Sequence, residues 1–89
     1  MSITMHIPSR LQAVTGNQPF IYVPFADNLL EALQLLASHC PDIKNSLFDM
    51  DNQINPYIRL SVNDVIVSDL TTPLSDNSDV FIFAAIAGG

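Results

Sequence analysis

Hydrophobic and polar residues alternate at the start of the chain, a pattern typical of a half-buried strand. The apolar side chains on its expected inner face are Ile3, Met5 and Ile7. Pro8 disturbs the end of this strand, and we expect residues 10–14 to continue it. A turn at 15–17, which contains Gly16, then leads into the aromatic and β-branched segment 20–23. The two segments are predicted to form a hairpin.

The segment 29–39 changes to the period of a helix. One face is polar, and the other carries the apolar residues Leu29, Leu33, Leu36 and Cys40. Asn28 precedes the segment and Glu31 stands three residues later, which is the spacing of a capping box. Pro41 either ends this helix or starts a second short one over 42–47.

Alternation returns after a polar loop at 49–56. Residues 57–62 are predicted to form a third strand, with Ile58, Leu60 and Val62 on its apolar face. Asn63 and Asp64 favour a tight turn into a short strand at 65–67.

The last strand is expected at 80–87, after an irregular stretch at 68–79. It is apolar on both faces, which indicates a central position in the sheet, beside the first strand and parallel to it. The predicted class is α+β: a mixed sheet of four or five strands with one main helix packed on one face.

Length and composition limit the classes of function that the chain can have. Eighty-nine residues, 48% of them apolar, suit a single domain over 1–89. The net charge is −6, and the only cations, at Arg10, Lys44 and Arg59, are too scattered for nucleic-acid binding. The chain has no apolar run long enough for a membrane span and no evident signal peptide. Its single cysteine favours a reducing, cytoplasmic setting.

Few side chains suggest chemistry of their own. His6 and His39 are too isolated to predict a metal site, and no nucleophile stands near a partner base in the pattern. Cys40 is expected to be a buried, inert cysteine at the helix end.

The chain ends in Gly88-Gly89 after the apolar strand. Glycine lacks a Cβ, so both residues can enter gaps closed to any other residue. We expect a flexible tail at 86–89 whose terminal carboxylate, on Gly89, is the reacting group, with Gly88 as a threading residue.

The element order, together with this ending, resembles the β-grasp (ubiquitin-like) sulfur carriers of the MoaD/ThiS family. The most specific part is 76–89, an acidic turn followed by an apolar strand and the two glycines. The hairpin residues 7–18 and the segment 57–64 resemble the cysteine-biosynthesis branch of that family. The chain departs from the family at Ala84 and Ala85, because a proline is often found there.

The resemblance implies a protein co-substrate that binds no cofactor, not an enzyme. An adenylyltransferase of the MoeB/ThiF type, related to ubiquitin-activating enzymes, would use MgATP to join the carboxylate to AMP. A persulfide donor would then supply sulfur, and a sulfur-accepting synthase would consume the thiocarboxylate. The small subunit of molybdopterin synthase, a ubiquitin-like modifier and an unrelated binding module of the same fold remain alternatives.

A partner must also hold the domain. Alternation along the last strand places Phe81, Phe83 and Ala85 on the side of the sheet away from the helix, together with His6 and Ser61. The predicted partner-binding residues are Tyr57, Arg59, Phe81, Phe83, Ala85, Ile86 and Ala87. The carboxylates that could steer a basic partner are Asp64, Asp69, Asp76 and Asp79.

Overall fold

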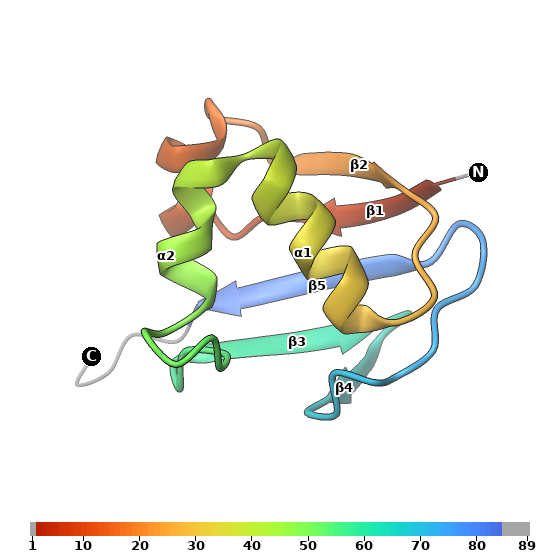
Figure 1. Cartoon of the computed structure of the whole chain (residues 1–89). Helices are drawn as coiled ribbons and strands as arrows, with labels where there is room; N and C mark the ends of the chain where they lie inside the picture. Colours follow the sequence, from red (N-terminus) through yellow and green to blue (C-terminus); the bar gives the residue numbers. More distant parts are fainter. Residues whose placement is uncertain (1, 85–89) are drawn as a thin grey trace.

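Within residues 2–84, five strands form one mixed sheet, and helix α1 (Leu29–His39) lies across one of its faces (Figure 1). The computed structural model describes residues 2–84. The strands follow the order β2-β1-β5-β3-β4 across the sheet. Their bounds are β1 Ser2–His6, β2 Phe20–Pro24, β3 Ile58–Val62, β4 Val65–Val67 and β5 Asp79–Ala84. The predicted α+β class with one main helix is confirmed, and the sheet, predicted to have four or five strands, has five.

β5 occupies the centre of the sheet, as its two apolar faces predicted. It pairs in parallel with β1, where His6 lies opposite Phe81, and antiparallel with β3, where Arg59 lies opposite Phe83. Residues 85–87 of the predicted strand lie outside the described residues.

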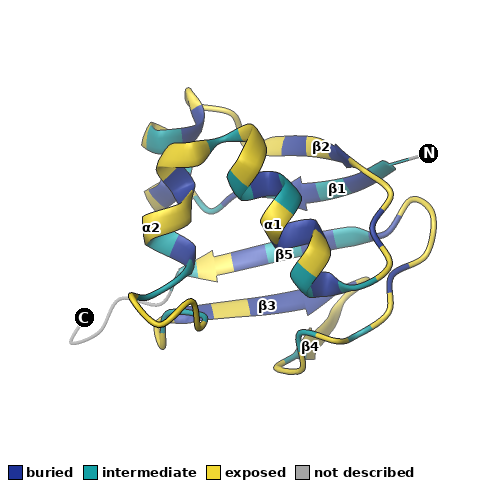
Figure 2. Cartoon of the chain, in the orientation of Figure 1, coloured by how far each residue is buried: buried dark blue, intermediate teal, exposed yellow. Residues whose placement is uncertain are grey.

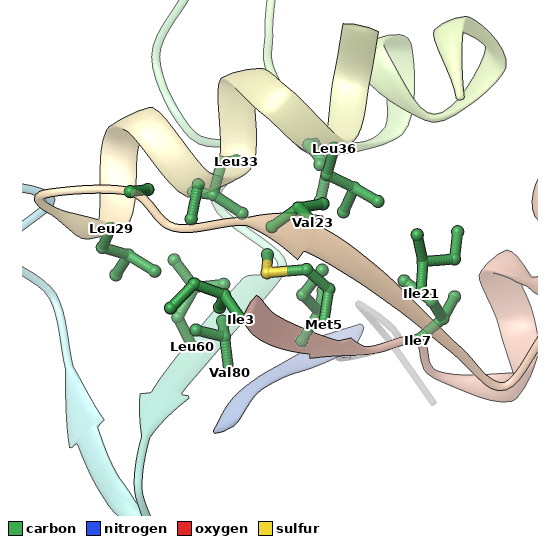
Figure 3. Packing of buried hydrophobic residues seen from close by; sticks show 14 of the residues in the cluster. Ile3, Met5, Ile7, Ile21, Val23, Leu29, Leu33, Leu36, Leu60 and Val80 are labelled. Atoms are coloured by element: carbon green, nitrogen blue, oxygen red, sulfur yellow. The ribbon is translucent and has the colours of Figure 1, made fainter. Parts of the chain in front are cut away.

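The core lies between α1 and the inner face of the sheet (Figures 2 and 3). Leu29, Leu33 and Leu36 of α1 are fully buried, and so are Ile3 and Met5 of β1. Burial of one such side chain stabilises a protein by about 1.5–3 kcal/mol. The predicted apolar faces of the helix and of the first strand are therefore correct, except that Cys40, expected to be buried, follows the helix as its C-cap and is only partly buried.

Helix α1 begins at the predicted cap. The side-chain oxygen of Asn28 accepts a hydrogen bond from the backbone N–H of Glu31 at 2.9 Å. The Glu31 carboxylate accepts from the N–H of Asp27 at 3.0 Å, one residue before the position that a standard capping box would use. After α1, a 3₁₀ turn at Pro41–Ile43 leads into the short helix α2 (Lys44–Leu47), as the second reading of Pro41 expected.

The expectation that residues 10–14 continue the first strand is wrong. Ser9–Thr15 form a 3₁₀ helix, which begins with a hydrogen bond from the Leu11 N–H to the Pro8 carbonyl at 2.9 Å. Leu11 and Val14 are three residues apart, so a helix of three residues per turn directs both toward the core. Gly16 stops this helix with a φ of 68°, a conformation that glycine adopts without strain.

The predicted turn between β3 and β4 is present and is tied to β5. Asn63 and Asp64 both have positive φ, 48° and 73°, as a type I′ turn requires. The Asn63 side-chain oxygen accepts from the Asp79 N–H at 2.9 Å, and the Asn63 N–H donates to the Asp79 carbonyl at 2.9 Å. These bonds fix the start of β5 against the hairpin.

Candidate docking face

Aromatic rings from three strands form a continuous row on the face of the sheet opposite α1. Alternation in each strand directs these side chains outward, while their neighbours fill the core. We call this set the aromatic row; its members, in order across the sheet, are Tyr22, Phe20, His6, Phe81 and Phe83.

The rings contact one another along the whole row. Tyr22 and Phe20 of β2 meet edge to face at 5.4 Å between centroids, and Phe20 lies 6.4 Å from His6 of β1. His6 stacks on Phe81 of β5 at 3.9 Å, and Phe81 lies 6.2 Å from Phe83. Aromatic pairs contribute about 0.5–1.5 kcal/mol each beyond area burial, which favours this arrangement of the rings.

His6 is held in the plane of its stack by a carboxylate. Its Nε2–H donates to Oδ1 of Asp79 at 2.9 Å, and Asp79 stands at the start of β5, two residues before Phe81. Both side chains are partly exposed, so the pair contributes little to stability. Its effect is to orient the imidazole, which fills the space between Phe20 and Phe81.

The predicted outward residues of β5 lie where the sequence placed them. Phe83 is 44% exposed, and Arg59 lies opposite it on β3. The Arg59 guanidinium donates to the backbone carbonyls of Pro56 and Ile58, which holds it near the start of β3. Arg59 therefore adds a positive charge beside the Phe83 end of the row.

Tyr57 lies apart from the aromatic row, although alternation grouped it with Arg59. It precedes β3, and its hydroxyl donates to the carbonyl of Ser46 in α2 at 3.2 Å. It therefore connects β3 to α2 at the end of the sheet where Ile58 pairs with Ala84. The other predicted site residues, Ala85, Ile86, Ala87, Gly88 and Gly89, lie outside the described residues.

Sequence reasoning missed two members of the row, Phe20 and Tyr22. They are 44% and 59% exposed, whereas Ile21 and Val23, which alternate with them, are buried. The alternation of residues 20–23 already indicated that the two aromatic side chains share one face of the strand. It became informative only once β2 was seen to pair with β1, because that pairing puts Phe20 opposite His6.

The predicted steering carboxylates lie at several places. Asp79 belongs to the outer face beside His6, while Asp64 lies in the β3–β4 turn and Asp76 in the loop before β5. The Asp69 carboxylate accepts from the Thr71 hydroxyl at 2.6 Å and from the Thr71 N–H at 2.9 Å. These two hydrogen bonds lower the pKa of Asp69 below its usual value of 3.8.

Residues 2–84 give no support to two other kinds of site. They contain no group of three or more histidine, cysteine or acidic side chains arranged to hold a metal ion. Among the helices that the structure describes, none is long and apolar enough to cross a membrane. The aromatic row is accordingly the main candidate site in this part of the chain.

A small α+β domain with a central last strand and one main helix across a five-stranded mixed sheet has the architecture of the β-grasp class. Residues 5–89 match the ThiS family, so the chain belongs to that family of β-grasp sulfur carriers. Members of the family carry sulfur and are not enzymes. No match to the chain was found among curated proteins.

Solved structures agree with this fold. SAMP1 from Haloferax volcanii has a TM-score of 0.89 at 20% identity, with 100% of both chains covered. A chain of the BexX/CysO complex from Amycolatopsis orientalis has a TM-score of 0.85 at 27% identity, covering 98% of this chain and 99% of that one. CysO from Mycobacterium tuberculosis has a TM-score of 0.83 at 26% identity, covering 94% and 99%. The chain thus has the β-grasp fold.

Proposed function

We propose that the chain carries sulfur as a thiocarboxylate on Gly89 and delivers it to cysteine biosynthesis. The observation that carries this proposal is the ThiS family match, which extends through Gly88 and Gly89. Five residues follow Ala84, where the described part of β5 ends. Because β5 is the central strand, the domain provides a rigid base for the segment that leads to the carboxylate.

The chemistry requires a partner, since a carboxylate is a poor acyl donor. An adenylyltransferase of the MoeB/ThiF type uses MgATP: a carboxylate oxygen of Gly89 attacks the α-phosphate and pyrophosphate leaves. A persulfide then attacks the acyl carbon and AMP leaves. A second thiol cleaves the resulting acyl disulfide and releases the thiocarboxylate, which a sulfur-accepting synthase consumes. Gly88 and Gly89 allow the tail to enter a site closed to water.

The docking face holds the domain while the tail reacts. Aromatic residues and arginine are enriched among the residues that anchor protein interfaces. Phe81, Phe83 and Arg59 are proposed as the anchors, with Tyr57 at the border of the contact. Phe83 is the member of the row nearest in sequence to the tail. In the same proposal Ala85, Ile86 and Ala87 line the partner's entry channel.

The cysteine branch is favoured by the two CysO structures, because they match nearly the whole chain at 26% and 27% identity. One of those structures is a complex with another protein, BexX, so a carrier of this fold does assemble with a partner. The likeness to SAMP1, at 20% identity, bears on the fold alone.

Intact-mass measurement of the protein from its native host tests the proposal. We expect a fraction whose mass corresponds to replacement of one oxygen by sulfur, and its loss in a variant lacking Gly88 and Gly89. Cysteine formation by reconstituted partners should depend on the same two residues. A branched Gly-Gly remnant on lysines of other proteins would instead establish a modifier. A stable large subunit that co-purifies and makes molybdopterin would establish that synthase.

A further inference from the structure

Strand β2 forms one edge of the sheet, and half of its backbone groups point away from β1. β2 pairs with β1 alone among the described strands. The Ile7 N–H donates to the Pro19 carbonyl at 2.8 Å, next to that ladder. Antiparallel bonding alternates, so odd-numbered residues of β2 bond to β1. The N–H and C=O groups of Phe20 and Tyr22 therefore face the open edge.

This edge lacks most features that protect natural edge strands from pairing. Such strands usually carry charges, bulges or a covering element. β2 has no charged residue, and its one protective feature is Pro24, which has no N–H to donate. Pro19 and Pro24 bracket the open segment and limit it to a short pairing that uses two N–H and two C=O groups.

A groove runs along the same edge and has a volume of about 430 Å³. β2 forms one wall, and the exposed side chain of His39, the last residue of α1, stands on the other. Gln18 and Pro19 contribute to its lining, together with Phe20, Ile21 and Tyr22. Free backbone groups thus border a space that can receive side chains.

We propose that the β2 edge binds an extended, uncharged or basic segment of a partner protein as a sixth strand. In this mode, backbone hydrogen bonds supply affinity and alternate side chains supply specificity. Partner side chains on the outer face would extend the aromatic row beyond Tyr22 and Phe20. Those on the inner face would enter the groove beside His39, so the segment should carry β-branched or aromatic residues at alternate positions.

Charge selects this occupant over a second copy of the chain. Each copy carries a net charge of −6, so pairing two copies would bring like charges together, whereas a neutral or basic segment meets no such repulsion. The other edge of the sheet is a poorer candidate. β4 has only three residues and is followed closely by Asp69 and preceded directly by Asp64.

The probe is a synthetic seven-residue peptide, Lys-Val-Thr-Val-Thr-Val-Lys, added to the full chain and followed by NMR hydrogen exchange. The Phe20 and Tyr22 amides should exchange at least roughly fivefold more slowly with saturating peptide, the factor expected of one net hydrogen bond. A peptide of the same composition with its alternation scrambled is the control. Hydrogen exchange with either peptide involves neither the tail nor adenylation. The strand-binding proposal can therefore succeed or fail independently of the sulfur-carrier proposal.

Two variants separate the backbone contribution from the side chain. Tyr22→Pro removes the edge N–H, and Tyr22→Ala removes only the ring, so the proline variant should bind the peptide roughly fivefold more weakly than the alanine variant. If the Tyr22→Pro variant fails to fold, hydrogen exchange of the wild-type chain with the peptide decides whether the edge binds a strand. Unchanged exchange at Phe20 and Tyr22 would overturn the proposal. If exchange of these two amides slows as the protein concentration rises, without any peptide, the proposal would be overturned in favour of pairing with a second copy of the chain.

Discussion

The imidazole of His6 lies flat against the phenyl ring of Phe81, with 3.9 Å between ring centroids and 3° between ring planes. The two residues are far apart in the sequence but are direct partners in the parallel pair of β1 and β5. Their contact joins the aromatic residues of the N-terminal hairpin to those of the last strand. The docking face is thus one surface built from both ends of the described chain.

Replacing His6 tests whether this contact orders the row. His6→Ala removes the stack with Phe81 and the hydrogen bond to Asp79, so we expect unfolding free energy to fall by about 1–2 kcal/mol. His6→Phe keeps a stacked ring without the hydrogen bond and should recover most of that loss. Urea denaturation measures all three proteins. Equal stability of His6→Ala and wild type would show that the stack is incidental.

Phe83 is expected to act in docking and not in folding. Because its ring is 44% exposed, Phe83→Ala should leave the unfolding midpoint nearly unchanged. The kcat/KM for adenylation should fall about tenfold or more, as for an interface hot spot. Val65→Ala is the matched control. Val65 is 61% exposed on β4, and its cross-strand partner Val62 faces inward, so Val65 lies on the side of the sheet away from the aromatic row. Unchanged adenylation in Phe83→Ala would remove Phe83 from the interface.

Asn28 should stabilise the helix that covers the core. Asn28→Ala deletes the acceptor for the Glu31 N–H and is expected to lower the unfolding free energy by about 1 kcal/mol. Asn28→Asp retains an acceptor and should stay close to wild type. Thermal melts followed by circular dichroism compare the three. A loss in the aspartate variant as large as in the alanine variant would contradict the capping role.

The Asp69–Thr71 pair predicts a pH effect of known sign. The pKa of Asp69 is lowered because the Thr71 hydroxyl and N–H stabilise its carboxylate. The associated stability is therefore present above the unfolded pKa and is lost as the pH falls through the lower, folded pKa. Thr71→Val keeps the N–H but loses the hydroxyl, so the Asp69 pKa should rise toward 3.8. An NMR titration of the carboxyl carbon measures it, and an unchanged midpoint would refute the assignment.

The acidic surface should accelerate docking to a basic partner. With a net charge of −6, the association rate with the activating enzyme is expected to fall as ionic strength rises, while the dissociation rate changes less. Asp79→Asn and Asp76→Asn should weaken this salt dependence. Stopped-flow measurements at several salt concentrations follow it. An association rate that does not depend on salt would exclude steering.

Segments with a strict period could be predicted from local sequence. Leu29, Leu33 and Leu36 identified the buried face of α1, and the two apolar faces of β5 indicated its central place. Asn63 and Asp64 predicted the turn between β3 and β4. Residues 10–14 were wrongly predicted as strand, because the three-residue spacing of Leu11 and Val14 matters only when the core lies beneath both side chains.

By itself, the sequence determined which side chains of α1 and of the regular strands face inward and where the helix begins, because these properties depend on neighbours within a few residues. Only the tertiary structure decided which outward side chains meet. Pairing of β1 with both β2 and β5 placed Phe20, His6 and Phe81 in one row, and the hydroxyl of Tyr57 turned to Ser46 instead. Alternation specifies the face of a strand but not its neighbours, since strand order and register arise from contacts between segments distant in the chain.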